Sequence, residues 1–180
     1  EVLTTGKFYT LCGCGQSGTK PFCDGSHADS NFQHDAPQNT KRIDRNPQTY
    51  HGTGLVVEDD RSLCMQAGFC GTRATNVWQL VSASGDTQIR AQIISMIEQC
   101  PSGALTYSLE PDEEDIEPDL PVEIAITPDG SLWVSGKVPI EWSDGNALEI
   151  RNRVTLCRCG SSKNRPLCDG THNEISFSAE

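Results

Sequence analysis

The strongest hydrophobic pattern lies in the middle of the chain. Large apolar residues recur there at spacings of three and four, which predicts an amphipathic helix: Ile89, Ile93, Ile94, Met96 and Ile97. Asp86 or Thr87 suits the start of that helix as a cap, and Pro101 ends it. Short apolar runs within residues 51–58 and 105–109 favour strands on either side. The segment therefore predicts a small strand-helix-strand unit.

A second pattern, typical of strands, follows in the last third of the chain. Apolar residues alternate with polar ones over 122–126, a Pro-Asp-Gly-Ser turn occupies 128–131, and an apolar segment returns over 132–137. Residues 151–155 favour one more strand, which leads into a cysteine-rich loop. We therefore expect a hairpin with an added strand here, and an α+β fold class for the chain.

Composition limits the size of any single core. Hydrophobic residues make up 36% of the 180 residues, aromatic residues make up 6%, and the mean hydropathy is -0.45. These values favour two or three small units over one large domain. No apolar run approaches the roughly 18 residues of a membrane-spanning helix. The net charge of -11 argues against a general nucleic-acid binder, because such proteins need cationic contacts to phosphate.

Much of the negative charge lies in one strip. Residues 110–123 contain eight acidic side chains, three prolines and no basic side chain. Like charges and prolines predict an extended, solvated linker over 110–121. A docking site for a basic partner is the alternative interpretation.

Nine cysteines stand out in a chain with so little apolar material. They form three groups of three: Cys12, Cys14 and Cys23; Cys64, Cys70 and Cys100; Cys157, Cys159 and Cys168. An odd count leaves one thiol over in a disulfide framework, and a disulfide within a Cys-x-Cys pair would strain the backbone. Metal ions or clusters are therefore favoured over disulfides.

The first and third groups belong to an internal repeat. Residues 11–27 (LCGCGQSGTKPFCDGSH) align without a gap to residues 156–172 (LCRCGSSKNRPLCDGTH), 145 positions further on. Each copy offers three thiolates and one imidazole. Four such ligands suit either a tetrahedral Zn²⁺ or the two irons of a [2Fe-2S] cluster, so spacing alone leaves both open. Asp24 and Asp169 follow the third cysteine at an expected helix start, where capping is the favoured role.

The pattern C-x-C-x2-S-x3-P-x-C-D-G-[ST]-H, present twice, resembles the CDGSH iron–sulfur family, also called NEET proteins. The resemblance implies one redox-active [2Fe-2S] cluster per motif, with the Cys-x-Cys pair on one iron and the third Cys and the His on the other. The implied ligands are Cys12, Cys14, Cys23 and His27, and Cys157, Cys159, Cys168 and His172. The family is associated with electron transfer, redox sensing and cluster donation, and no enzymatic signature accompanies it.

The middle cysteines resemble a different family. C-x5-C followed by C-P-S-G-A-L is similar to the divergent single-cluster ferredoxin domain, which implies a cluster held by Cys64, Cys70 and Cys100. That family often has a His two residues after its first Cys, where this chain has Gln66, a poor iron ligand. A [3Fe-4S] cluster, a [4Fe-4S] cluster with a non-cysteine ligand, and three buried thiols without a cluster all stay open.

Together these patterns predict two small β-rich CDGSH units flanking a ferredoxin-like strand-helix-strand insert. Only eleven residues precede Cys12, so the frame of the first unit looks shortened. The two motifs are expected to pack about an internal pseudo-two-fold axis, in a monomer or a weak oligomer. The expected boundaries are 1–45 for the first unit, 50–109 for the insert, 110–121 for the linker and 122–180 for the second unit.

The predicted function is one-electron transfer or reversible [2Fe-2S] cluster transfer, with redox or cluster-acceptor proteins as partners and no enzymatic activity. A structural zinc-binding interaction module and a redox subunit of a larger oxidoreductase are the alternatives. Labile clusters with paired thiolates are assembled in a reducing interior, which favours the bacterial cytoplasm, with an organelle matrix as the second location.

Overall fold

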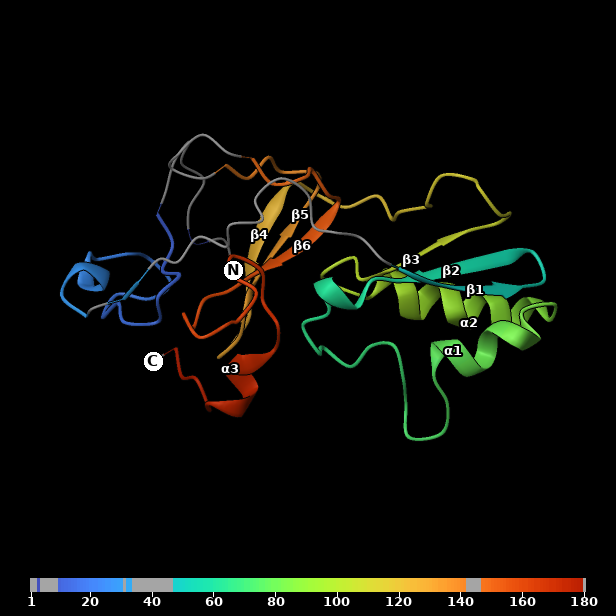
Figure 1. Cartoon of the computed structure of the whole chain (residues 1–180), viewed down its shortest axis with the longest axis horizontal. Coiled ribbons are helices and arrows are strands. Elements are labelled where there is room, and N and C mark those ends of the chain that lie inside the picture. The colour runs from blue at the N-terminus through green and yellow to red at the C-terminus, as the bar shows by residue number, and fades with distance from the viewer. Residues whose placement is uncertain (1–2, 4–9, 31, 34–46, 142–146, 180) are drawn as a thin grey trace.

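The computed structural model describes residue 3 and residues 10–30, 32–33, 47–141 and 147–179 (Figure 1). Within them the strands form two antiparallel sheets of three strands each, in the orders β1-β2-β3 and β4-β5-β6. Short helices accompany both sheets, so the predicted α+β class is confirmed. The shortened frame expected ahead of Cys12 and the expected end of the first unit at residue 45 lie outside the described residues.

The first sheet and its helix form the insert. Its strands are β1 (Gln48–Gly52), β2 (Leu55–Asp59) and β3 (Leu105–Ser108), with β2 paired to both neighbours. The strand expected from the apolar run within 51–58 is confirmed as β2, but the segment also contains a tight hairpin turn at Gly54, with φ +62°, which joins β2 to the unpredicted β1. The outer strand β1 has exposed polar residues at Gln48, Thr49 and His51 and little apolar signal, which is why it was missed.

Helix α2 (Thr87–Glu98) confirms the predicted amphipathic helix. The side chain of Asp86 accepts hydrogen bonds from the backbone amides of Gln88 and Ile89, so Asp86 is the cap. The helix packs with the sheet around a core of nine buried residues: Leu55, Val57, Val77, Val81, Ile93, Met96, Ile97, Leu105 and Tyr107. The remaining helical segments are single turns, namely α1 (Val77–Leu80), α3 (Thr171–Glu174) and the 3-10 helices Ser26–Ala28, Arg61–Leu63 and Val81–Ala83.

The second sheet confirms the predicted hairpin and added strand. It comprises β4 (Glu123–Ile126), β5 (Leu132–Ser135) and β6 (Arg153–Leu156). Its core is shared with the insert, because one buried cluster contains residues of both: Leu63, Ala104, Val134, Val154 and Leu167. This shared core holds the insert against the second cysteine-rich loop.

The acidic strip between the two sheets is largely exposed but is anchored at three consecutive residues. The Ile116 amide donates to the Tyr107 carbonyl oxygen over 2.7 Å, and Glu117 pairs with Arg153 at 2.7 Å. The Pro118 carbonyl oxygen accepts from Asn152 over 2.8 Å. The expectation of a wholly solvated linker is therefore wrong for residues 116–118, which pair with the two sheets.

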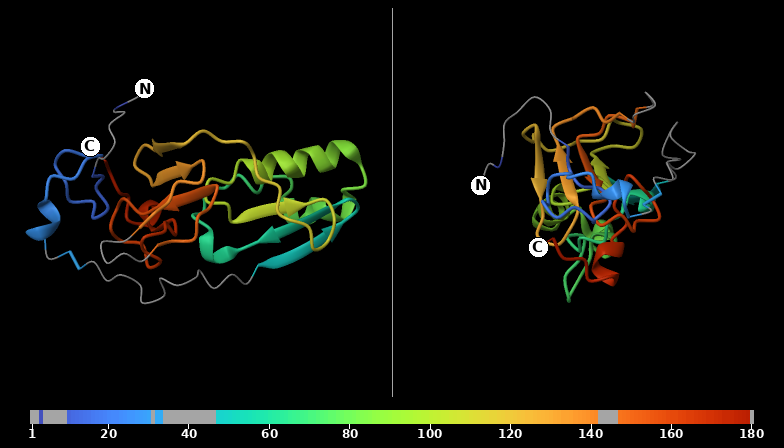
Figure 2. Two further views of the ribbon diagram at one scale, coloured as in Figure 1. Left: turned by 90° about the horizontal axis from the view of Figure 1, so that it is seen from above. Right: turned by 90° about the vertical axis from the view of Figure 1, so that its left-hand side faces the viewer.

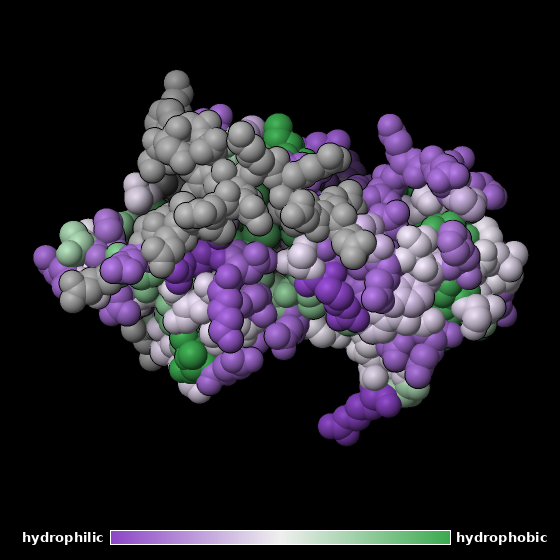
Figure 3. Space-filling view, viewed as in Figure 1, coloured by the Kyte–Doolittle hydropathy of each residue, from purple (hydrophilic) through white to green (hydrophobic). Residues whose placement is uncertain are grey.

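The three parts of the chain lie in a row along its longest axis (Figure 1, Figure 2). Residues 10–30 and 32–33 are at one end, the second sheet with α3 is in the middle, and the first sheet with α2 is at the other end. On the face shown in Figure 3, hydrophilic residues predominate and hydrophobic ones form small separate patches. Among the described helices, none has the length and apolar character needed to cross a bilayer.

Candidate metal centres

The first cysteine loop is closed by backbone hydrogen bonds across its neck. The Cys12 amide donates to the Pro21 carbonyl oxygen over 2.8 Å, and the Cys23 amide donates to the Thr10 carbonyl oxygen over 2.9 Å. Inside the loop, the hydroxyl of Ser17 donates to the Phe22 carbonyl oxygen over 2.6 Å. These bonds bring the Cys-x-Cys pair beside the third cysteine, although eight residues lie between Cys14 and Cys23 in the sequence.

The second loop repeats this geometry. The Cys157 amide donates to the Pro166 carbonyl oxygen over 2.7 Å, and the Cys168 amide donates to the Thr155 carbonyl oxygen over 2.9 Å. Ser162 donates its hydroxyl to the Leu167 carbonyl oxygen over 2.7 Å, as Ser17 does in the first loop. The sequence repeat is therefore also a repeat of conformation.

In each loop the donor atoms of the expected ligands form two close pairs. The close pairs are Cys12 Sγ and Cys14 Sγ at 3.8 Å, Cys23 Sγ and His27 Nδ1 at 3.6 Å, Cys157 Sγ and Cys159 Sγ at 3.8 Å, and Cys168 Sγ and His172 Nδ1 at 3.3 Å. Two donors on one tetrahedral metal atom, with bonds of about 2.0 to 2.3 Å, lie at about such separations. Across the part of the chain that the structure describes, no three His, Cys, Asp or Glu side chains converge on a single ion position.

Asp24 and Asp169 hold the turn that carries the histidine. Asp24 accepts hydrogen bonds from the Ser26 hydroxyl, the Ser26 amide and the Gly18 amide, and these bonds hold its carboxyl pKa well below the usual range. Asp169 accepts from the amides of Thr171 and Lys163 in the same way. Each acid therefore binds the amide of the first residue of the helical turn, as a cap would, although Gly25 and Gly170 occupy the N-cap positions themselves.

Hydrogen bonds and burial also give the three thiols of the second loop different pKa values. The side-chain hydrogen bond with Cys159 lowers the pKa of Cys157 to about 6, and nearby backbone amides act in the same direction. The same bond raises the pKa of Cys159. Burial raises the pKa of Cys168 to about 11. The Cys157 sulfur is thus the one most ready to bind metal as a thiolate.

The two loops meet at their Cys-x-Cys ends. A Cβ atom added to Gly15 would lie 2.6 Å from the Cys159 carbonyl oxygen, and one added to Gly160 would collide with the Cys14 carbonyl oxygen. The contacts are reciprocal between equivalent positions of the repeat. They support the expected internal pseudo-two-fold relation between the motifs.

Arg158 lies in this interface and was missed from the sequence. It occupies the position between the paired cysteines that Gly13 has in the first loop, and its side chain is 4% exposed. Its guanidinium donates to the Thr127 carbonyl oxygen over 3.0 Å and faces the Phe177 ring at 5.9 Å. Burial lowers the pKa of Arg158, while the nearby Cys12 opposes that shift. A cation from the second loop thus acts on a ligand of the first.

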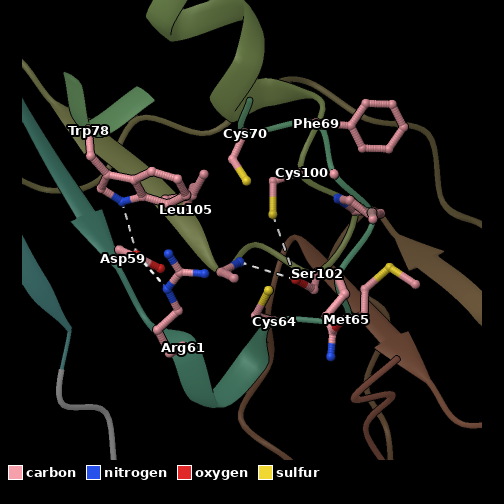
Figure 4. A pocket seen from close by; sticks show the side chains of 15 residues that line it. Asp59, Arg61, Cys64, Met65, Phe69, Cys70, Trp78, Cys100, Ser102 and Leu105 are labelled. Atoms are coloured by element: carbon pink, nitrogen blue, oxygen red, sulfur yellow. Dashed lines mark hydrogen bonds and ion pairs between the residues drawn. The ribbon is translucent and has the colours of Figure 1, made fainter. Parts of the chain in front are cut away.

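The three middle cysteines line one pocket (Figure 4). Cys64 follows the 3-10 turn Arg61–Leu63, Cys70 ends the next loop, and Cys100 follows α2. Figure 4 shows their sulfur atoms turned toward the same space. The structure therefore brings together three residues that span 36 positions of sequence.

A cation borders this pocket. The Arg61 Nε lies 2.8 Å from a carboxylate oxygen of the buried Asp59, and its guanidinium lies 4.6 Å from the Trp78 ring centroid. Trp78 donates its indole N–H to Asp59 over 3.0 Å. Burial raises the pKa of the Cys70 thiol, and the Arg61 charge acts against this rise. Arg61 gave no sequence signal, because its role depends on a fold-level contact with Asp59 and Trp78.

Gln66 belongs to the lining of this pocket, but its side-chain amide is bound to the second CDGSH loop. Its side-chain amide donates to the Asp169 carbonyl oxygen over 3.2 Å, and so joins the insert to the second CDGSH loop. The hydroxyl oxygen of Ser102 lies 3.7 Å from Cys100 Sγ. A non-cysteine oxygen is therefore present at this pocket.

The comparisons with known proteins agree with this geometry. Residues 1–28 and 129–173 match the family described as iron-binding zinc finger, CDGSH type, and residues 50–110 match the family described as divergent 4Fe-4S mono-cluster. The class is therefore that of iron–sulfur proteins. The chain carries two CDGSH segments with a divergent mono-cluster domain between them. No curated protein matches the chain.

Proposed function

We propose that this protein transfers single electrons, [2Fe-2S] clusters, or both, through its two CDGSH loops. The observation that supports this proposal is the arrangement of each loop as two pairs of donors. Each pair is spaced for one metal atom, and the two pairs together match the two irons of a [2Fe-2S] cluster. A single Zn²⁺ would instead draw all four donors around one centre.

The ligand assignment follows from these pairs. Cys12 with Cys14, and Cys157 with Cys159, hold the inner iron of each site, and these four sulfurs are all buried. The third cysteine and the histidine of each loop hold the outer iron. When bound, a [2Fe-2S] cluster supplies one reversible electron step, and its single imidazole ligand makes it releasable.

The protein contributes shielding and charge to these sites. The amide of Gln16 points at Cys14 Sγ over 3.4 Å, and the amides of Gly160 and Ser162 stabilise the Cys157 thiolate. Such donors lower the energy of added negative charge at the sulfurs and thereby favour the reduced state. We assign no catalytic side chain and propose redox proteins or cluster acceptors as partners.

For the insert we propose a third centre held by Cys64, Cys70 and Cys100. Their shared pocket and the match to a mono-cluster family support it. Three cysteines suit a [3Fe-4S] cluster, or a [4Fe-4S] cluster whose fourth ligand is an oxygen such as that of Ser102. The iron content separates these cases from an insert without a cluster.

Two measurements test the transfer function. A redox titration of the reconstituted protein, followed in the visible spectrum, should show one-electron waves for the CDGSH sites. Incubation with an apo-ferredoxin should then move the colour and the iron to the acceptor. A protein that neither takes up electrons reversibly nor loses iron to the acceptor would contradict the proposal.

A further inference from the structure

The two copies of the CDGSH loop differ in how far their outer ligands are covered. His27 is exposed, whereas His172, its equivalent 145 positions later, is 7% exposed. Cys23 is half-buried, whereas Cys168 is 3% exposed. The same local loop therefore has an open outer side in the first copy and a closed one in the second.

The cover over the second loop comes from the cysteine-rich segment of the insert. A Cβ atom added to Gly170 would lie 3.0 Å from the Met65 carbonyl oxygen and 3.2 Å from atoms of the Gln66 side chain. At the equivalent Gly25, the same atom would have no neighbour within 4 Å among the described residues. The Asp-Gly turn before the histidine is thus packed in one copy and free in the other.

Two hydrogen bonds tie this cover to the loop. Gln66 donates its side-chain amide to the Asp169 carbonyl oxygen over 3.2 Å. Asn164 donates its side-chain amide to the Ser62 carbonyl oxygen over 2.7 Å, and the equivalent position of the first loop is Thr19, which bonds to Ser17 within its own loop. The contact with the insert is therefore built from residues particular to the second copy.

A shared core lies beneath the same contact. Leu63 and Leu167 are both buried in one hydrophobic cluster, and they directly precede Cys64 and Cys168. The third ligand of the second CDGSH loop is therefore fixed to the insert through its neighbour. Its release would require that part of this core open.

The outer side of the first loop instead borders a cavity. The cavity has a volume of about 440 Å³, and its lining includes all four expected ligands of the first loop, Cys12, Cys14, Cys23 and His27. Arg165, Pro166 and the Cys157 ligand of the second loop line it as well, whereas the outer ligands of that loop, Cys168 and His172, do not. An acceptor thiolate can reach the exposed His27 side of this site.

We propose that the two loops divide the work: the first loop, with Cys23 and His27, is the site of cluster exchange, and the second loop keeps its cluster because Met65 and Gln66 cover it. This inference rests on the proposed function, in which both loops hold [2Fe-2S] clusters. Exchange is a ligand substitution, in which an acceptor thiolate replaces the imidazole and then the thiolates on iron. No change of oxidation state accompanies it, and the cluster leaves as cargo.

The test uses the full, reconstituted protein with excess apo-ferredoxin at neutral pH. Cluster movement is followed in the visible spectrum, timed samples are separated from the acceptor and only then treated with iodoacetamide, and mass spectrometry assigns the labelled peptides. We expect two phases of labelling. Cys12, Cys14 and Cys23 are labelled in the fast phase. Cys157, Cys159 and Cys168 are labelled at least about tenfold more slowly, which corresponds to a difference of about 1.4 kcal/mol.

A variant that removes the cover makes the test specific. Gln66→Ala should speed the slow phase by about three- to tenfold, as expected for one lost hydrogen bond, and leave the fast phase unchanged. Thr19→Ala removes a hydrogen bond within the first loop, outside the contact with the insert, and as a control should leave the slow phase unchanged.

The outcomes separate this inference from the function on which it rests. Equal labelling of both loops, or earlier labelling of Cys168 than of Cys23, would overturn the division of work while leaving cluster transfer intact. Retention of both clusters in the presence of the acceptor would overturn cluster transfer and this inference together.

Discussion

Arg153, in the strand that leads into the second CDGSH loop, donates a hydrogen bond to the carbonyl oxygen of Cys100 over 2.9 Å. The same guanidinium, 3% exposed, also donates to the carbonyl oxygens of Ile97 and Leu105 and pairs with Glu117. One buried side chain therefore ends helix α2, positions a cysteine of the insert and anchors the acidic strip. Arg153 thus links the two sheets. Its positive charge also lies at the C-terminal end of α2, where a cation is favourable.

Replacement of this cation should destabilise the whole molecule. Arg153→Met leaves several buried carbonyl groups and Glu117 without their donor, at a cost of about 3 kcal/mol. We expect the Tm of the reconstituted protein to fall by roughly 5 to 10 °C. Arg153→Lys should fall in between, because a lysine keeps the charge and loses the fork of donors. Exposed Arg73→Met is the control, and an equal effect there would refute the role of Arg153.

The histidine ligands should set the acid sensitivity of the clusters. A neutral imidazole binds iron and a protonated one does not, so falling pH should bleach the protein. Burial lowers the pKa of His172, so its imidazole is harder to protonate in the folded loop than in an unfolded chain. The stability that the neutral imidazole contributes is therefore fully present above the ordinary histidine pKa of about 6.5. It is lost as the pH falls below that value and through the lowered pKa of the folded state.

His172→Cys and His27→Cys each remove this acid-sensitive ligand. We expect slower bleaching below neutral pH and a lower midpoint potential for the altered site, since a thiolate adds negative charge. Visible absorbance after a pH jump and a redox titration measure the two effects. Unchanged bleaching in both variants would show that neither histidine is a ligand.

The Arg61 charge should raise the potential of a centre in the insert. Because Arg61 is 57% exposed, solvent screens much of its charge, and we expect Arg61→Gln to lower the midpoint by on the order of 50 mV. Arg61→Lys keeps the charge and should shift it far less. Spin-resonance signals followed during a redox titration would report the insert centre by itself. Identical midpoints for the three proteins would exclude this electrostatic role.

The reciprocal contact between the loops predicts a difference between two glycine substitutions. Gly160→Ala and Gly25→Ala both place a side chain at positive φ, +77° and +91° respectively, with a strain of about 1 to 2 kcal/mol. Only at Gly160 does the new Cβ also collide with the opposite loop, at the Cys14 carbonyl oxygen. Gly160→Ala should therefore lower the Tm and the retained iron more than Gly25→Ala. Equal losses would argue against close packing of the loops.

The sequence predicted those parts that local patterns encode. The cap at Asp86, the helix it starts and the hairpin of β4 and β5 follow from spacing and turn residues that act over a few positions. The repeat displays the candidate ligands twice, and the structure places their donor atoms in close pairs. Strand β1 was missed because an outer strand with polar faces has no apolar alternation.

The contacts between the units could not be predicted from such local patterns. Arg153, Arg158 and Arg61 look like surface charges in the sequence, and only the fold shows that the first two are buried. The difference in cover between His27 and His172 likewise depends on where the insert packs. A repeat in sequence predicts equal ligands and cannot predict unequal surroundings.

The most direct test is a combined iron and acid-labile sulfide analysis of the purified protein, with low-temperature spin resonance after reduction. Two [2Fe-2S] clusters alone require about four irons per chain, and a third centre at Cys64, Cys70 and Cys100 raises the count to about seven or eight, with sulfide and a signal from reduced [2Fe-2S] in both cases. A folded, colourless protein with two zinc ions per chain and no sulfide would contradict the central claim.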